Sequence, residues 1–348
     1  MASNSKGLAR AARSMLGVIV KDLPRYLPSL ARGGDAYLTI RNRDERLEVG
    51  PEKQGYRCDW KWTSELHAPK IIPALGRAML RKALKAHPVL VADAASTDAA
   101  NPPQVSFIIG HRGMQRLPHL LATLRSIAAQ QGVSFETIVV EQDSEATLSR
   151  HVPQGVRVIH TPSTPQMPYN RSWAFNAGVK HARGQVLVLH DNDMLIPVDY
   201  AAAIAARIRA GYEVVNAKRF IFYLTQAHSE AVMRGDANLL DHAPESIVQN
   251  LEGGGSVAIT RAAYEAIGGM DESFVGWGGE DNEFWERALT RRTWTWGSMP
   301  IVHLWHAAQP GKRDSNYATA VRYRNLSAVD PVARIAALRA KMLAQPPS

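Results

Sequence analysis

Residues 185–193 (Gln185-Val186-Leu187-Val188-Leu189-His190-Asp191-Asn192-Asp193) join a continuous apolar run to a cluster of polar side chains. A run this short, made of β-branched and aliphatic residues, is typical of a strand that is buried on both faces of a parallel sheet. The stretch therefore predicts an α/β fold in which the carboxyl end of one strand carries Asp191, Asn192 and Asp193.

The segments around this strand alternate in the same way. Short apolar runs predict strands at 105–109, 136–140 and 156–160, and amphipathic runs predict helices at 117–130, 172–182 and 199–210. This alternation is typical of βαβ units, which form a mostly parallel central sheet with helices on both faces. Such sheets bind ligands beyond the carboxyl ends of their strands. The residues that follow the first two strands, Arg112 and Glu141 among them, are therefore candidates for ligand binding.

A segment of small and polar residues, 96–104, predicts a linker. It divides a basic extension (1–95, with helices expected at about 6–32 and 71–86) from an α/β domain (105–313). A helical tail (314–348) follows. Within the α/β domain we also expect a helix capped by Thr260, a helix at 280–292 and a strand at 294–304.

Positive charge is concentrated near the N-terminus. The chain has 41 Lys and Arg against 32 Asp and Glu, a net charge of +9, and residues 1–100 hold 17 of these basic and 10 of these acidic residues. Basic residues flank an apolar segment at 15–20, which favours contact with an anionic membrane surface, although a solvated helical face explains the same pattern. We find no zinc-binding spacing, RNA-binding motif or basic recognition helix, so nucleic acid is not an expected partner.

The apolar segments and the cysteine content indicate a cytoplasmic protein. The longest apolar runs have the length of a strand rather than the ~20 residues of a membrane-spanning helix, and we recognise no signal peptide. Cys58 is the single cysteine, so the chain cannot form an internal disulfide. We expect a cytoplasmic location. Binding of lipid by the basic region would place the protein at the inner face of the cytoplasmic membrane as a peripheral protein.

Residues 276–284 (Gly276-Trp277-Gly278-Gly279-Glu280-Asp281-Asn282-Glu283-Phe284) form an acidic turn that combines glycines, a tryptophan and carboxylates. The glycines allow positive φ or a close approach to a ligand, and Trp277 offers a flat face to a sugar ring. Glu280 and Asp281 open the next predicted helix, whose dipole favours ionised carboxylates. They are candidate catalytic groups, with Asp281 as the general base, although helix capping alone would also explain both acids.

Asp191-Asn192-Asp193 is a DXD-type element, which can hold a divalent ion that bridges the phosphates of a nucleotide-sugar. A simple polar turn is the alternative. His303 and His306 add imidazoles, and carboxylates combined with imidazole suit Mn²⁺ better than Mg²⁺. Residues three apart on a regular strand point to opposite faces, so both histidines can bind one ion only where the strand has ended. We expect Mn²⁺, with Mg²⁺ as the alternative.

Across residues 105–313 these motifs, in this order, resemble those of the β-1,4-galactosyltransferase type of GT-A glycosyltransferase and its bacterial relatives. The resemblance implies a GT-A fold, which is Rossmann-like. It implies metal positions at Asp193 and His306, with His303 where the animal enzymes have a methionine ligand, and the base at Asp281. The nucleotide-sugar positions that it implies are Arg112, Tyr169, Arg171, Asp191, Asn192, Lys218, Gly254, Gly255 and Trp277. The strand-end Glu141 is a further candidate for the same ligand. The implied acceptor positions are Trp277, Gly278 and Asn282.

The chain departs from this family at three places. Asn282 replaces an acid that contacts the acceptor, Glu252-Gly253 replaces an aromatic pair that helps to select the donor sugar, and Met114 replaces an arginine. The resemblance implies metal-dependent, inverting transfer of a hexose, with galactose or N-acetylgalactosamine favoured. The donor is a UDP-sugar, and the acceptor is a glycan or lipid-linked saccharide in bacterial surface polysaccharide or lipopolysaccharide synthesis. A retaining GT-A transferase and a noncatalytic sugar-nucleotide or glycan-binding protein are the alternatives.

Overall fold

The computed structural model describes residues 2–59, 63–93, 102–250, 253–276, 278–308 and 317–344. Most of the predicted linker at 96–104 lies outside these residues, as does Trp277. The chain divides into two compact units. The first comprises residues 1–89, 218–251 and 296–305, and the second comprises residues 90–217, 252–295 and 306–348. The predicted domain boundaries stay a prediction.

A seven-stranded sheet forms the centre of the second unit, in the order β13-β9-β12-β7-β4-β5-β6. The strands β7, β4, β5 and β6 run parallel to one another, and β13 runs parallel to β9, whereas β12 is antiparallel to both of its neighbours. The expected mostly parallel sheet is therefore confirmed. Its strands are β4 (Val105–His111), β5 (Phe135–Glu141), β6 (Arg157–His160), β7 (Val186–His190), β9 (Val214–Val215), β12 (Ser256–Thr260) and β13 (Thr293–Trp294).

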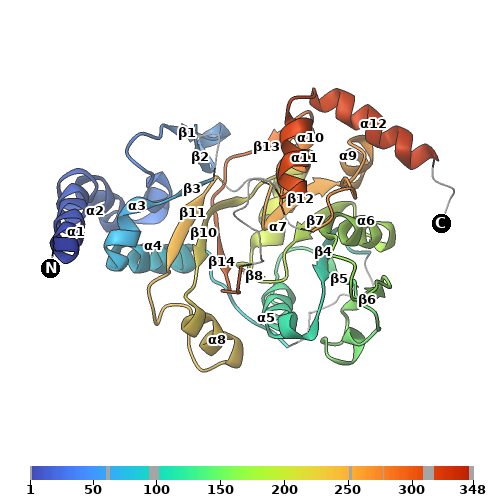
Figure 1. Cartoon of the computed structure of the whole chain (residues 1–348), viewed down its shortest axis with the longest axis horizontal. Helices are drawn as coiled ribbons and strands as arrows, with labels where there is room; N and C mark the ends of the chain where they lie inside the picture. The colour runs from blue at the N-terminus through green and yellow to red at the C-terminus, as the bar shows by residue number, and fades with distance from the viewer. Residues whose placement is uncertain are drawn as a thin grey trace. The chain divides into compact units, whose positions relative to one another are not determined.

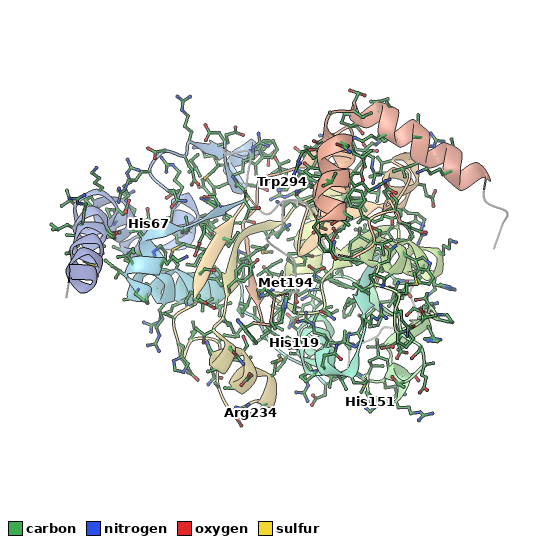
Figure 2. All side chains as sticks on the ribbon, viewed as in Figure 1. His67, His119, His151, Met194, Arg234 and Trp294 are labelled. Atoms are coloured by element: carbon green, nitrogen blue, oxygen red, sulfur yellow. The ribbon has the colours of Figure 1, made fainter. Side chains whose placement is uncertain are left out.

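The strand order of this sheet reverses at β4. The chain runs from β4 through α5 (Leu117–Ala128) to β5 and β6 on one side, and then through α6 (Arg171–His181) to β7 on the other side. Ile109 of β4 pairs with His190 of β7, so the carboxyl ends of both strands lie at one edge. Met194 of β8 (Met194–Leu195), labelled in Figure 2, follows this edge along the chain. In open α/β sheets such a reversal is where ligands bind.

Helices cover both faces of the sheet, which confirms the predicted α/β class. On one face, α6, α9 (Arg261–Ala266) and α10 (Glu280–Ala288) bury apolar side chains against the strands. Figure 1 shows α6 beside β4 and β5. The helix α7 (Tyr200–Arg209) lies on the opposite face: the Tyr200 hydroxyl donates to Ser256 at 3.0 Å, and Ser256 points away from the buried Val257 next to it.

Two predicted elements of this region end differently in the structure. The helix predicted at 280–292 ends at Ala288, because the hydroxyls of Thr290 and Thr293 donate to the carbonyls of Arg287 and Ala288 at 2.7 and 3.0 Å. The strand predicted at 294–304 is two strands, β13 in the second unit and β14 (Met299–His303) in the first. The predicted C-terminal tail contains α11 (Ala318–Ser327) and α12 (Pro331–Ala344).

The first unit contains a mixed sheet in which β3 (Ser64–Glu65), β11 (Ser246–Gln249), β10 (Lys218–Tyr223) and β14 lie in that order. The strands β10 and β14 are parallel, and β11 is antiparallel to β10 and β3. The helical segments of this unit are α1 (Ala2–Lys21), α2 (Leu23–Ala31), η1 (Gly34–Thr39), α3 (His67–Ile71), α4 (Pro73–Ala86) and α8 (Gln226–Arg234), and β1 (Leu47–Val49) pairs with β2 (Tyr56–Cys58). None of the described helices has the length and apolarity needed to span a membrane.

Arg219 of β10 explains why the N-terminal segment folds together with residues from much later in the chain. Its buried guanidinium donates to the carbonyls of Leu38 and Ile40 at 2.9 and 2.8 Å and to the Gln249 side chain at 2.6 Å. A buried cation requires such acceptors, since an unpaired charge in the interior is costly. The segment at 38–40 is thereby fixed against β10 and β11.

Candidate active site

The DXD-type segment lies directly beyond β7, at the reversal of the sheet. Arg116, where α5 begins, donates to Asn192 at 3.0 Å and to Asp193 at 2.5 Å. The Asn192 amide nitrogen also lies 3.1 Å from Nδ1 of His111, the last residue of β4. Burial lowers the pKa of His111 to about 4, and the nearby Arg116 charge acts in the same direction. The imidazole is therefore neutral at neutral pH, so Nδ1 can accept the hydrogen bond from Asn192.

Asp193 and His306 are candidate metal ligands in the second unit. Nε2 of His306 lies 3.4 Å from Oδ2 of Asp193, and Asp193 is only 5% exposed. One carboxylate oxygen and one imidazole nitrogen form a donor set that fits a divalent transition ion such as Mn²⁺. His303 ends β14 in the first unit, and its part in metal binding stays a prediction.

Arg171, the first residue of α6, brings three carboxylates together. Its guanidinium lies 2.6 Å from Asp191 and 3.7 Å from Glu280, and it forms an ion pair with Asp281. The Asn170 side chain caps the helix by accepting an amide hydrogen bond at 2.9 Å, which fixes where Arg171 emerges. The DXD-type segment and the acidic turn, which are far apart in the sequence, therefore meet at one arginine.

Glu280 titrates near neutral pH. Its side chain is 9% exposed. Burial and, to a smaller extent, the Asp281 charge outweigh the opposing Arg171 and raise the pKa of Glu280 to about 7. For Arg171 itself, burial opposes the charge, but the carboxylates of Asp191, Asp281 and Glu280 outweigh burial and raise its pKa well above the ordinary value. Near pH 7 Arg171 is therefore charged, while Glu280 is divided between its protonated and ionised forms.

Two glycines let the backbone approach these groups closely. A Cβ on Gly110 would lie 2.0 Å from the hydroxyl oxygen of Tyr169, so this ring packs directly on the end of β4. A Cβ on Gly253 would lie 2.4 Å from the carbonyl oxygen of Asp281. A larger residue at either position would displace Tyr169 or the start of α10. Burial raises the pKa of Tyr169, so its hydroxyl stays protonated at neutral pH.

Arg112 and Glu141, two of the predicted nucleotide-sugar residues, bind neighbouring loops. Arg112 donates to the carbonyl of Thr164 at 3.1 Å and to that of Met167. One carboxylate oxygen of Glu141 accepts three hydrogen bonds, at 2.9 to 3.0 Å, from residues 147 and 148. These contacts order the loops that follow β5 and β6, and contact with a nucleotide stays a prediction for both.

Two of the three predicted glycines adopt the positive-φ backbone that favours glycine. Gly255 has φ 78° and accepts the Asp191 amide hydrogen at 2.9 Å, and Gly278 has φ 96°. Gly254 is buried, whereas Asn282 is exposed on α10. Lys218 opens β10 in the first unit, where it is buried, so its contact with a donor stays a prediction.

Sequence analysis counted His111 among the residues that follow the first predicted strand, but it missed Arg116 as a part of the site. The resemblance implied an arginine at position 114, where this chain has Met114, but Arg116, two residues later, places a guanidinium on the DXD-type segment. The signal was present in the sequence: Arg116 precedes the predicted helix at 117–130, and His111 ends the adjacent strand. Both positions belong to the same strand-to-helix turn, which a parallel sheet directs toward its ligands.

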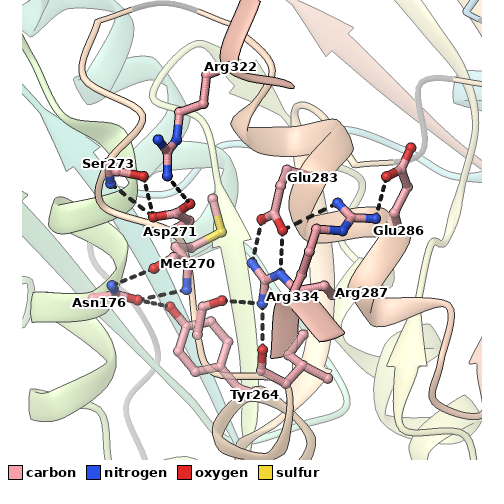
Figure 3. Close-up of polar contacts among 12 residues, drawn as sticks. Asn176, Tyr264, Met270, Asp271, Ser273, Glu283, Glu286, Arg287, Arg322 and Arg334 are labelled. Atoms are coloured by element: carbon pink, nitrogen blue, oxygen red, sulfur yellow. Dashed lines mark hydrogen bonds and ion pairs between the residues drawn. The ribbon is translucent and has the colours of Figure 1, made fainter. Parts of the chain in front are cut away.

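A buried network of ion pairs and hydrogen bonds joins α10 to the neighbouring segments (Figure 3). Arg287 donates to both carboxylate oxygens of Glu283 at 2.7 Å. Arg334 of α12 lies 3.4 Å from Glu283 and 2.6 Å from Glu286, and the Tyr323 hydroxyl of α11 donates to Glu286 at 2.6 Å. Because Glu280 and Asp281 form the first turn of α10, these contacts fix the helix that presents both acids.

Comparison with known proteins decides the family. A family model described as glycosyltransferase like family 2 matches residues 106–310, which is more than half of the chain. The chain belongs to this family. The predicted likeness to glycosyltransferases is thereby confirmed. In this member of glycosyltransferase like family 2, every candidate site residue falls within the matched range, whereas α11 and α12 lie beyond it.

One solved structure similar to the chain is the catalytic domain of Drosophila β1,4-galactosyltransferase 7 in complex with xylobiose. The identity is 16% and the TM-score is 0.32, and the match covers 56% of this chain. The chain spans 64% of the length of that structure. None of the curated proteins matches this member of the family.

Proposed function

We propose that this chain is a metal-dependent, inverting glycosyltransferase. It moves a hexose, with galactose or N-acetylgalactosamine favoured, from a UDP-sugar to a glycan or lipid-linked saccharide of the bacterial surface. The observation that carries the proposal is the cluster at Arg171, which joins Asp191 of the DXD-type segment to Asp281 of the acidic turn. An inverting transferase requires this proximity, because the base and the leaving group act on opposite sides of a single carbon atom.

Asp281 is the general base of the proposed reaction. It takes the proton of the acceptor hydroxyl as the acceptor oxygen bonds to the anomeric carbon. The bond from that carbon to the phosphate oxygen breaks, and its electron pair leaves with UDP, so no covalent enzyme intermediate forms. Arg171 holds the Asp281 carboxylate in position, and Glu280, with a pKa of about 7, is a neighbouring group that can hold a proton.

Asp193 and His306, with His303 as a third ligand, would hold the proposed metal ion, and a bound ion would supply positive charge to the diphosphate. Arg116 adds a guanidinium at the same segment. The proposed donor contacts are the strand-end Glu141 and the residues that the resemblance implies, which are Arg112, Tyr169, Arg171, Asp191, Asn192, Lys218, Gly254, Gly255 and Trp277. The proposed acceptor contacts are Trp277, Gly278 and Asn282.

The first test replaces the base. Asp281→Asn should lower the rate of transfer by at least about a hundredfold, because general base catalysis contributes factors of that size, while donor affinity changes little. Calorimetric titration with the donor and a UDP-release assay separate the two effects. Glu145→Gln, which alters an exposed carboxylate of the same unit, is the control. An Asp281→Asn variant that transfers at the rate of the wild type would remove the base assignment.

The second test identifies the donor and the stereochemistry. A panel of UDP-sugars is scored for Mn²⁺-dependent hydrolysis, which fixes the donor without knowledge of the acceptor. NMR of the anomeric proton in the product then distinguishes inversion from retention. A protein that binds UDP-sugars but neither hydrolyses nor transfers any of them would be a binding protein rather than an enzyme.

A further inference from the structure

Exposed apolar side chains are concentrated in the N-terminal helices. Within the described residues, the large apolar side chains that lie exposed between residues 15 and 27 are Met15, Leu16, Ile19, Val20 and Leu27. Four of these five belong to one helix, α1, so they form part of one surface rather than a scatter over the chain. Single exposed apolar residues are ordinary, whereas a contiguous group indicates an interaction site.

The spacing of these residues places them on one side of α1. Leu16, Ile19 and Val20 are related by three and four residues, so they lie on one helical face, and Met15 borders Ile19. They are well exposed, at 61% for Leu16, 46% for Ile19 and 64% for Val20, whereas Val18 between them is completely buried. The helix therefore has an inner face at Val18 and an unpartnered apolar face, formed by Leu16, Ile19 and Val20, away from it.

Contacts within the first unit keep this face directed outward. Arg43 donates to the carbonyl of Gly17 at 3.0 Å and lies 2.6 Å from the Asp22 carboxylate. These bonds attach the end of α1 to the segment that follows η1, and α1 also packs against α2 and α3, as Figure 1 shows in blue. Anchoring through Val18, Gly17 and Asp22 leaves the opposite side of the helix for another partner.

The charge around the apolar face has one sign. Residues 1–32 contain Lys6, Arg10, Arg13, Lys21, Arg25 and Arg32 against a single acid, Asp22. That acid is 6% exposed and paired with Arg43, whereas Arg13, Lys21, Arg25 and Arg32 are exposed. The side chains available to a partner are thus apolar and positive. Anionic lipid is complementary to this combination, since a bilayer surface offers phosphate charge next to an acyl region.

We propose that α1 is an interfacial helix that binds the surface of an anionic bilayer, with Leu16, Ile19 and Val20 in the acyl boundary and the basic residues at the lipid phosphates. This binding does not depend on the transfer chemistry, so it can fail or succeed independently of the proposed function. It would hold the chain at a surface where a lipid-linked acceptor is present.

The test measures binding of the full chain to vesicles by cosedimentation. Vesicles of phosphatidylcholine that contain phosphatidylglycerol should bind the protein at low salt, and vesicles of phosphatidylcholine alone should bind it much more weakly. The double variant Leu16→Asn/Ile19→Asn should lower the partition coefficient by at least about tenfold, because two exposed aliphatic side chains lose their transfer into the acyl boundary. Lys21→Gln should lower it about fivefold, the loss expected for one basic residue near the surface, and salt should reduce that difference.

The matched control is Val329→Asn/Val332→Asn, which changes two exposed aliphatic residues (43% and 62% exposed) near the other end of the chain. It should leave vesicle binding within about twofold of the wild type, since those residues lie outside the proposed face. Equal binding by Leu16→Asn/Ile19→Asn and the wild type would overturn the proposal, as would failure of the wild type to bind phosphatidylglycerol vesicles. A wild-type dimer in light scattering that this double variant converts to a monomer would also overturn it, by assigning the face to a second copy of the chain.

Discussion

Arg287→Met should be among the most destabilising single changes in the second unit. Arg287 is completely buried and Glu283 is 1% exposed, and the two side chains share two hydrogen bonds of 2.7 Å. The same guanidinium donates to the carbonyls of Ile267 and Gly269 at 2.6 and 2.7 Å. Methionine has a similar apolar length but replaces none of these four bonds, so the change removes charge while it largely preserves volume.

The expected cost follows from what remains after the substitution. The Glu283 carboxylate would stay buried with Arg334 at 3.4 Å as its remaining ion pair among the described residues. Removing one partner of a buried ion pair costs about 3–5 kcal/mol, because the other charge is left uncompensated. We therefore expect Arg287→Met to lower the free energy of unfolding by about that amount. Arg291→Met breaks an exposed pair with Glu213, where both side chains are about one-third exposed, and should cost at most about 1 kcal/mol.

Urea unfolding, followed by tryptophan fluorescence and by circular dichroism, measures both variants. Two probes are needed because a chain with two compact units need not unfold in one step. The double variant Glu283→Gln/Arg287→Met should recover much of the loss, since neither buried charge remains. If Arg287→Met and Arg291→Met differ by less than about 1 kcal/mol, the argument that this buried pair fixes α10 is refuted.

Three further predictions concern the candidate site. Burial raises the pKa of Glu280 from 4.5 to about 7, so its stabilising contribution is complete below about pH 4.5 and is lost as the pH rises through 7. The wild type should therefore lose on the order of 3 kcal/mol relative to Glu280→Gln across that range, and parallel stability profiles would contradict this. Gly110→Ala places a Cβ 2.0 Å from the Tyr169 hydroxyl and should cost about 1–3 kcal/mol in urea unfolding, whereas Gly33→Ala, with open space around it, should be nearly neutral. Arg116→Met removes a cation 2.5 Å from Asp193 and should tighten Mn²⁺ binding without nucleotide by about tenfold in electron paramagnetic resonance titrations, and weaker binding would contradict this.

The positions of the strand ends were predictable from the sequence, because they depend on local patterns. The apolar run at 186–189 and the polar residues after it placed the carboxyl end of β7 within one residue, and the same pattern at 105–109 placed that of β4 within two residues. Parallel pairing then brings the two ends to one edge, which requires no knowledge of individual side-chain contacts. The location of the candidate site therefore followed from the periodicity of the chain.

The ion pairs of the site were not predictable in this way. Arg171 could be assigned to the nucleotide from the resemblance, but its contacts with Asp191 and Asp281 depend on how α6 and α10 pack on the sheet. The end of α10 at Ala288 likewise depends on the competing hydroxyl of Thr293, which a helical pattern does not reveal. Local patterns determine which residues reach the edge of a sheet, whereas tertiary packing determines which of them touch.

The C-terminal helices α11 and α12 pack against the acidic turn, although they lie outside the range that the family model matches. The family match ends at residue 310, yet Tyr323 of α11 lies so close to Gly279 that a Cβ on that glycine would be 2.8 Å from the tyrosine Cβ. Tyr317 lies equally close to Gly276, because a Cβ on that glycine would be 2.8 Å from the tyrosine hydroxyl. Both glycines have positive φ, near 90°, so the acidic turn adopts a backbone that glycine permits and that the two tyrosines enclose. Helices beyond the matched range thus help to hold the turn that presents Glu280 and Asp281, and the contacts that fix α10 extend at least as far as Arg334.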